Sequence, residues 1–146
     1  MEKKYFIGLM ALIMGMFVLA SCSSDDDEET ANVDRASLVG KWINTRIDWD
    51  DRDGHDYETY NNSNRYLLLE NDGTGKVSPY NLFEDEKRNG FSWSVSKNKL
   101  ITVEPDGDRE EYIIVKVTAN ELVLRWDDSP YLIETHTFKR YEGTNN

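Results

Sequence analysis

The spacing of apolar residues constrains the fold of this chain more than any other feature, because its period is two residues and not 3.6. Phe91 and Trp93 alternate with serines, and Ile113, Val115 and Val117 alternate with their neighbours. Successive side chains of a strand point to opposite faces, so this alternation is typical of a strand with one buried face. Strand-like segments occupy residues 42–49, 66–70, 75–80, 91–95, 100–104, 113–117, 122–126 and 131–139. The pattern predicts about eight strands and an all-β fold.

Short turn sequences separate these segments. Asn71-Asp72-Gly73 follows one of them and favours a tight turn, because Asp and Gly tolerate positive φ. Other turn sequences occupy residues 97–99, 105–108, 119–121 and 127–130. Short links make consecutive strands antiparallel neighbours, which predicts a meander. A meander of eight strands has no exposed edge when it closes, so we expect a small barrel.

The barrel domain is expected to extend over residues 34–141 as a single unit. This length suits one hydrophobic core, and the segment contains no long repeat and no Gly/Ser-rich linker. Residues 34–38 are predicted to form one helical turn, with Asp34 as its N-terminal cap. Residues 142–146 are polar and are predicted to be a disordered tail.

The N-terminal segment has the order of a bacterial export signal. Lys3 and Lys4 precede an uncharged apolar stretch, residues 6–20, which is shorter than the roughly 20 residues of a membrane span. Small residues then lead to Cys22, which is the only cysteine and therefore has no internal disulfide partner. The alternative is an N-terminal anchor helix with a buried structural cysteine.

Leu19-Ala20-Ser21-Cys22 resembles the lipobox of signal peptidase II substrates. That resemblance implies that residues 1–21 are a cleaved signal peptide and that Cys22 carries the lipid. Each buried methylene of an acyl chain contributes about 0.8 kcal/mol, so two or three chains anchor firmly. Residues 22–33 would then be the lipidated cysteine and a flexible tether, extended by the repelling charges of residues 25–29.

The acidic run after Cys22 also resembles the serine-plus-acid signal of surface-exported lipoproteins of the Bacteroidetes. We therefore expect a protein that is anchored by lipid in the outer membrane and exposed at the cell surface. The chain has a formal net charge of −11, which becomes −12 when residues 1–21, with two lysines and one glutamate, are removed. Nucleic acid would repel such a chain, so we expect no nucleic-acid partner, and we expect a monomer.

Gly40-Lys41-Trp42 lies between the predicted helical turn and the first predicted strand, and it resembles the lipocalin signature. In that family the tryptophan lies across the closed end of the barrel and packs on a basic residue of the last strand. The resemblance implies that Gly40 and Trp42 form the barrel floor with Lys139 or Arg140. Lipocalin-like domains of Bacteroidetes lipoproteins are more similar still, through Leu38-Val39-Gly40-Lys41-Trp42, Asp72-Gly73-Thr74, Trp93 and Phe138-Lys139-Arg140.

The resemblance implies a binding protein for a small apolar or amphipathic ligand, without catalysis. The interior of an eight-stranded barrel is either filled by side chains or holds one small ligand, and the sequence leaves both open. Trp93 and Trp126 are the candidate ligand contacts, and packing in the core is the alternative for both. A second hypothesis is a surface module that binds glycan or protein through loops and exposed aromatics such as Tyr57, with the barrel as scaffold.

Residues 48–58 are rich in acidic side chains and contain His55. Calcium prefers several carboxylate oxygens, but Tyr60 stands where an EF-hand counted from Gly54 requires glutamate. We expect a solvated acidic loop, with an irregular calcium site as the alternative. As the longest predicted connection, this loop could also cover a barrel mouth. His136 is the only other histidine, which disfavours a zinc site, and no nucleophile–base pair is recognisable. We therefore expect no enzyme, no metal and no cofactor.

Overall fold

The computed structural model describes residues 32–83, 86–87 and 89–143. The predicted signal segment, Cys22 and most of the predicted tether lie outside these residues, so the export and lipidation hypotheses stay predictions. In the described part of the chain, no helix is long and apolar enough to cross a membrane.

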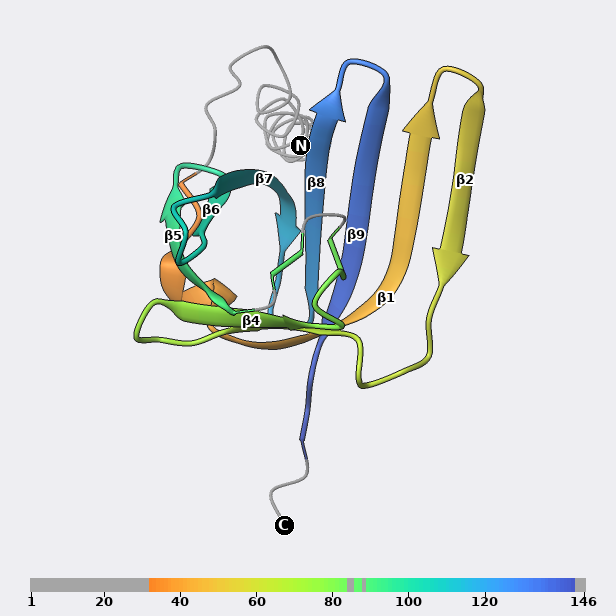
Figure 1. Ribbon diagram of the computed structural model, residues 1–146. Helices are drawn as coiled ribbons and strands as arrows, with labels where there is room; N and C mark the ends of the chain where they lie inside the picture. The colour runs from red at the N-terminus through yellow and green to blue at the C-terminus, as the bar shows by residue number, and fades with distance from the viewer. Residues whose placement is uncertain (1–31, 84–85, 88, 144–146) are drawn as a thin grey trace, which may run out of the picture.

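In the residues that the structure describes, one 3₁₀ turn and nine antiparallel strands make up the fold (Figure 1). The elements are η1 (Arg35–Leu38), β1 (Gly40–Asp51), β2 (Gly54–Thr59), β3 (Tyr66–Leu69), β4 (Thr74–Ser78), β5 (Phe91–Ser96), β6 (Lys99–Val103), β7 (Arg109–Val117), β8 (Glu121–Ser129) and β9 (Leu132–Arg140). The strand order is β2-β1-β3-β4-β5-β6-β7-β8-β9, and β1 also pairs with β9. This closure produces an eight-stranded barrel with β2 as an extra strand, which confirms the predicted all-β meander and its closure.

The long strand β1 belongs to the barrel and also to a sheet that extends beyond it. Its first residues, from Gly40 to Ile43, pair with β3, whereas Arg46 to Asp51 pair with β2. Strand β9 pairs with β1 along almost its whole length, past a bulge after Asn44. A bulge bends a strand and increases its twist. In Figure 1, β8, β9, β1 and β2 accordingly stand side by side and reach beyond the ring of β5, β6 and β7.

The acidic stretch, residues 48–58, was predicted to be a loop and is instead a β-hairpin. It forms the end of β1, a turn and most of β2, and the Asp51 carboxylate accepts hydrogen bonds from the backbone N–H groups of Asp53 and Gly54. The loop prediction was wrong because every residue of β2 is exposed, so β2 has no buried row for a period-two pattern to reveal. Between the described strands, the largest separation in sequence is that from Ser78 of β4 to Phe91 of β5.

The buried face of β7 also differs from the apolar row of the sequence. Tyr112 and Ile114 are buried, whereas Val115 is 55% exposed. A bulge between Ile114 and Lys116 changes the register with β8, so the alternation shifts by one residue at that point.

The barrel interior is occupied by one continuous cluster of apolar side chains. The buried members are Leu38, Trp42, Leu67, Leu69, Val77, Leu82, Phe83, Phe91, Trp93, Leu100, Tyr112, Ile114, Leu122, Leu124 and Phe138. Phe83 comes from the connection between β4 and β5, and its ring centroid lies 4.7 Å from that of Tyr112 on β7. A connecting segment therefore contributes an aromatic ring to the core beside the strands.

Candidate functional site

Trp42 and Arg140 pack against each other where the start of β1 pairs with the end of β9. Trp42 is fully buried, and its Nε1 donates a hydrogen bond to the carbonyl of Leu38 in η1 at 2.9 Å. The guanidinium carbon of Arg140 lies 4.1 Å from the centroid of the Trp42 ring. Its three nitrogens donate to three carbonyl oxygens, those of Ser37, Val39 and Ala119. Of the two basic residues suggested for this position, Arg140 occupies it and Lys139 is exposed.

Gly40 allows Arg140 to approach this closely. Its φ is +138°, a conformation that residues with a Cβ rarely adopt, and an added Cβ would lie 2.7 Å from Nη1 of Arg140. The turn η1 leads into this position, with Asp34 as its cap, because the Asp34 carboxylate accepts a hydrogen bond from the Ala36 N–H at 3.0 Å. The Gly-x-Trp motif therefore lies where η1, the start of β1 and the end of β9 meet.

Trp93 belongs to the packed wall of the barrel. It is 5% exposed, its Nε1 donates to the carbonyl of Glu70 at 2.9 Å, and the Arg35 guanidinium lies 4.3 Å from its ring centroid. Its polar atom and one face of its ring are thus engaged by the protein itself.

The inner face of β8, β9 and β1 becomes less buried with distance from the Trp42 end. In the register of the sheet, Glu134 on β9 has Trp126 of β8 on one side and Trp49 of β1 on the other. Both tryptophans are half-buried. One step closer to the floor, His136 has Leu124 and Ile47 as its neighbours. Trp126 therefore lies at the far end of the barrel from Arg140, beside an acidic residue.

Glu134 and His136 form a buried pair within this apolar surface. Their exposed fractions are 2% and 1%, and Oε1 of Glu134 is hydrogen-bonded to Nε2 of His136. The Phe83 ring lies against the His136 ring, with 4.8 Å between the two ring centroids. Oε2 of Glu134 and Nδ1 of His136 have no hydrogen-bond partner among the described residues.

Sequence reasoning considered His136 only as a zinc ligand and did not consider Glu134. A signal was present, because the inward row of β9 contains Glu134, His136 and Phe138 at a spacing of two. Two polar residues in a row that also contains a buried phenylalanine are unusual, since buried ionisable groups are rare unless they are paired.

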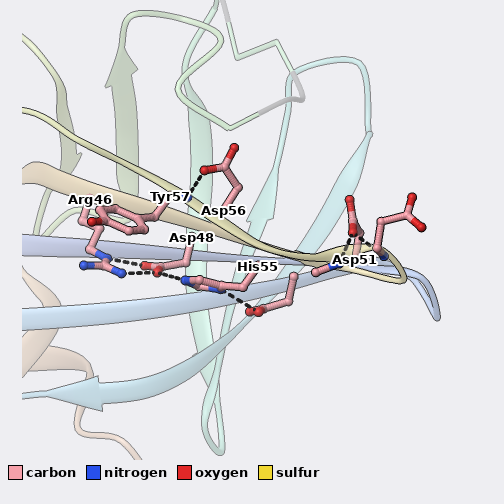
Figure 2. A network of polar contacts seen from close by, with 9 residues as sticks. Arg46, Asp48, Asp51, His55, Asp56 and Tyr57 are labelled. Carbon is pink, nitrogen blue, oxygen red and sulfur yellow. Dashed lines mark hydrogen bonds and ion pairs between the residues drawn. The ribbon is translucent and has the colours of Figure 1, made fainter.

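Tyr57 lies on the outer face of the β1–β2 hairpin, away from the barrel interior. It is 53% exposed, and the Arg46 guanidinium lies 4.0 Å from its ring centroid. Arg46 also donates two hydrogen bonds to the Asp48 carboxylate, at 2.6 and 2.8 Å. His55 lies between Asp48 and Asp50, at 3.2 and 2.7 Å (Figure 2). The three predicted ligand contacts, Trp93, Trp126 and Tyr57, thus lie in three different places.

These contacts on the outer face also change the pKa of an acidic residue of the hairpin. The pKa of the Asp48 carboxyl lies below its usual range, first because Arg46 donates hydrogen bonds to it and, to a smaller extent, through the charges of Arg46 and His55. Of the carboxylates in the predicted calcium alternative, Asp48 and Asp50 contact His55 of β2 across the hairpin. Figure 2 shows Arg46, Asp48 and His55 in one row along the hairpin.

In the part of the chain that the structure describes, one group of acidic residues is close enough to hold a metal ion. Glu104, Asp106 and Asp108 lie in the turn between β6 and β7, with one oxygen of each within 4.8 Å of the others. The Asp106 carboxylate accepts a hydrogen bond from the Asp108 N–H at 3.0 Å, so it stabilises the turn itself.

A groove of about 470 Å³, with polar and apolar surface in similar amounts, lies where the loop between β2 and β3 meets the end of β9. Its lining includes Tyr60, Tyr141 and the side chains of Asn61, Asn62 and Asn120. Aromatic rings and amides in an open groove can bind a hydroxyl-rich molecule, because the rings stack on its apolar faces and the amides form hydrogen bonds.

Residues 38–124 match a family model that is described as a lipocalin-like domain. The match covers more than half of the chain and extends from the 3₁₀ turn into β8. The chain has no significant match among curated proteins or solved structures.

Proposed function

This chain belongs to the lipocalin-like domain family, and on that premise we propose that it is a lipid-anchored binding protein. Its barrel would hold a small apolar or amphipathic molecule without chemical conversion. The proposal combines a ligand-binding scaffold with an anchor at Cys22 that displays the domain at the cell surface. The family membership supports the scaffold, and the sequence supports the anchor.

The observation that carries the binding role is the inner face at the end opposite Trp42. Trp49 and Trp126 are half-buried there and flank Glu134 in the register of the sheet. Concave apolar surface with a few polar groups is the usual composition of a small-molecule site. Trp126 packs against the apolar cluster and is only partly buried, so we place the contact with a ligand at this end, beyond the side chains that fill the interior.

Recovery of a bound molecule tests the binding role. The protein is purified from membranes of the producing cells, and its organic extract is analysed by mass spectrometry. We expect one small amphipathic species, which is lost from Trp126→Arg and kept in Tyr57→Ala, because Tyr57 lies on the outer face. The same yield of every species from both variants would contradict the proposal.

Replacement of Cys22 tests the anchor. In Cys22→Ser the acyl chains cannot attach, so we expect the protein to leave the outer-membrane fraction. In the unchanged protein, external protease added to whole cells should degrade the domain if it faces outward. Retention of Cys22→Ser in the membrane fraction would contradict lipid anchoring, and protection from protease would contradict surface display.

A second candidate function is a surface module that binds glycan. The groove lined by Tyr60 and Tyr141 favours it, because its lining combines two aromatic residues with three asparagines. Glycan-array binding that is lost in Tyr141→Ala and kept in Trp126→Arg would support this function over the barrel site.

A further inference from the structure

The buried pair of Glu134 and His136 has unused hydrogen-bonding capacity in an apolar environment. Oε1 and Nε2 satisfy each other, whereas Oε2 and Nδ1 have no partner among the described residues. A buried polar atom without a partner costs about 1–3 kcal/mol. Two such atoms on adjacent inward positions of one strand are therefore a costly arrangement, unless a molecule that binds there supplies the missing partners.

The chemistry of the two free atoms follows from the cost of burying a net charge. That cost is several kcal/mol, so the favoured states are those in which the pair is neutral as a whole. The pair is then either a carboxylate with an imidazolium or a carboxyl group with a neutral imidazole. In both states Oε2 accepts a hydrogen bond, and Nδ1 carries a proton and donates one.

The surroundings of the pair are mostly apolar and aromatic, and Tyr60 also lies within range of the charge of Glu134. Phe83 lies against the His136 ring, and the positions beside Glu134 on the neighbouring strands are Trp49 and Trp126. The Phe83 ring offers no hydrogen bond to Oε2 or Nδ1. A ligand that takes the place of this ring would bury an apolar tail and satisfy both atoms.

We propose that Glu134 and His136 are the polar anchor of the barrel site, and that the ligand is an uncharged amphipathic molecule. Its head group both donates and accepts a hydrogen bond, as in an alcohol or a primary amide. This inference rests on the proposed ligand-binding function and adds the class of ligand. A buried water molecule would satisfy the same two atoms, and the experiment below distinguishes it from a ligand.

A head-group series on one tail tests the proposal. The probes are 1-octanol, octanamide, octanoate and octylammonium, and binding is measured by calorimetry and by tryptophan fluorescence. The protein is the predicted mature chain with Cys22→Ser, which retains every barrel strand. We expect 1-octanol and octanamide to bind at least tenfold more tightly than the two charged probes, because a charged head would bring a net charge to the buried pair.

Two variants assign that preference to the pair. Glu134→Met with His136→Leu replaces both polar groups by apolar ones of similar volume, a change that buried ion pairs often tolerate. We expect this double variant to bind all four probes without the tenfold head-group preference. Thr102→Val is the matched control, since Thr102 Oγ1 is another buried polar atom without a partner among the described residues. We expect it to keep the full preference.

Imidazole nitrogen NMR of the unchanged protein gives a second measurement that does not depend on how the double variant folds. The chain has two histidines, and His55 lies on the outer face, so it serves as an internal reference. We expect octanamide to shift the Nδ1 resonance of His136 and to leave that of His55 unchanged.

The outcomes separate this inference from the proposed function. Equal binding of all four probes, an unshifted His136, or a preference that survives in the double variant would overturn the anchor and leave the barrel site standing. A fixed buried water predicts the first two of these results. If no probe binds at all, both the barrel site for such molecules and the anchor are overturned.

Discussion

Arg140, the last residue of β9, lies over the ring of Trp42, which is near the start of β1, with 4.1 Å between guanidinium carbon and ring centroid. The two residues are also register partners in the ladder that closes the barrel. Three backbone carbonyls hold the guanidinium in place. The family motif around Gly40 and Trp42 therefore joins the two ends of the barrel sequence, and it stabilises closure.

Arg140→Lys should destabilise the protein by about 2 kcal/mol, because a lysine cannot reproduce a planar group with several directed donors. The free energy of unfolding in urea is the measurement. Arg125→Lys is the matched control, since Arg125 forms its exposed ion pair with Asp127 on the outer face, and we expect a change below about 0.5 kcal/mol. Equal effects of the two substitutions would contradict the role assigned to Arg140.

Gly40→Ala should cost more stability than Gly54→Ala. Both glycines have a large positive φ, +138° at Gly40 and +148° at Gly54. An added Cβ at Gly40 would lie 2.7 Å from Arg140, whereas at Gly54 it would have no atom within 4 Å. Backbone strain of this kind costs about 1–3 kcal/mol, and the contact with Arg140 adds to it. In an Arg140→Ala background the cost of Gly40→Ala should fall, and thermal unfolding of the four proteins of this cycle checks it. An unchanged cost would show that the contact is irrelevant.

Asp48 should stabilise the β1–β2 hairpin at neutral pH and not in strong acid. Its pKa is lowered in the folded protein, chiefly by hydrogen bonds from Arg46. The stabilisation is therefore complete above the unfolded pKa, about 4, and is lost as the pH falls through the lower folded value. Asp48→Asn should be less stable than the unchanged protein at pH 7, by about 1 kcal/mol or less, and the gap should narrow below pH 3. Asp53→Asn, in the turn of the same hairpin, is the control for the loss of one charge.

Tyr60 should titrate far above an ordinary tyrosine. Burial and, next, the hydrogen bond that its hydroxyl donates to Glu58 raise its pKa to about 12. The stability that results is complete below the unfolded pKa, about 10, and is lost as the pH rises towards 12. Ring-carbon NMR of labelled tyrosine measures the titration, and Tyr60→Phe assigns the signal. In Glu58→Gln the pKa should fall but stay above 10, because burial is the larger cause.

Most of the barrel follows from local patterns. The alternation around Phe91 and Trp93 and the turn at residues 71–73 predict strands and antiparallel neighbours, and both are present. The strand β2 escaped prediction because its exposed residues have no apolar row, and its pairing with β1 decides its conformation. The buried face of β7 was not predicted for a related reason, since the bulge after Ile114 depends on the register with β8.

The candidate site depends even more on contacts between distant segments. The inward direction of Glu134 and His136 follows from the row of β9, but the position of Phe83 against them does not follow from the spacing of either residue. The same holds for the choice of Arg140 over Lys139, because only the closure of the barrel brings one of them to Trp42.

By itself the sequence determined the all-β meander, its turns and the motif at residues 40–42, because strand alternation and turn chemistry act over a few residues. Only the tertiary structure decided that the acidic stretch is a hairpin, that Arg140 covers Trp42, and that Glu134 and His136 are buried together, with two polar atoms that have no partner among the described residues. Burial and pairing between residues far apart in the chain are properties of the closed barrel, and no local pattern contains them.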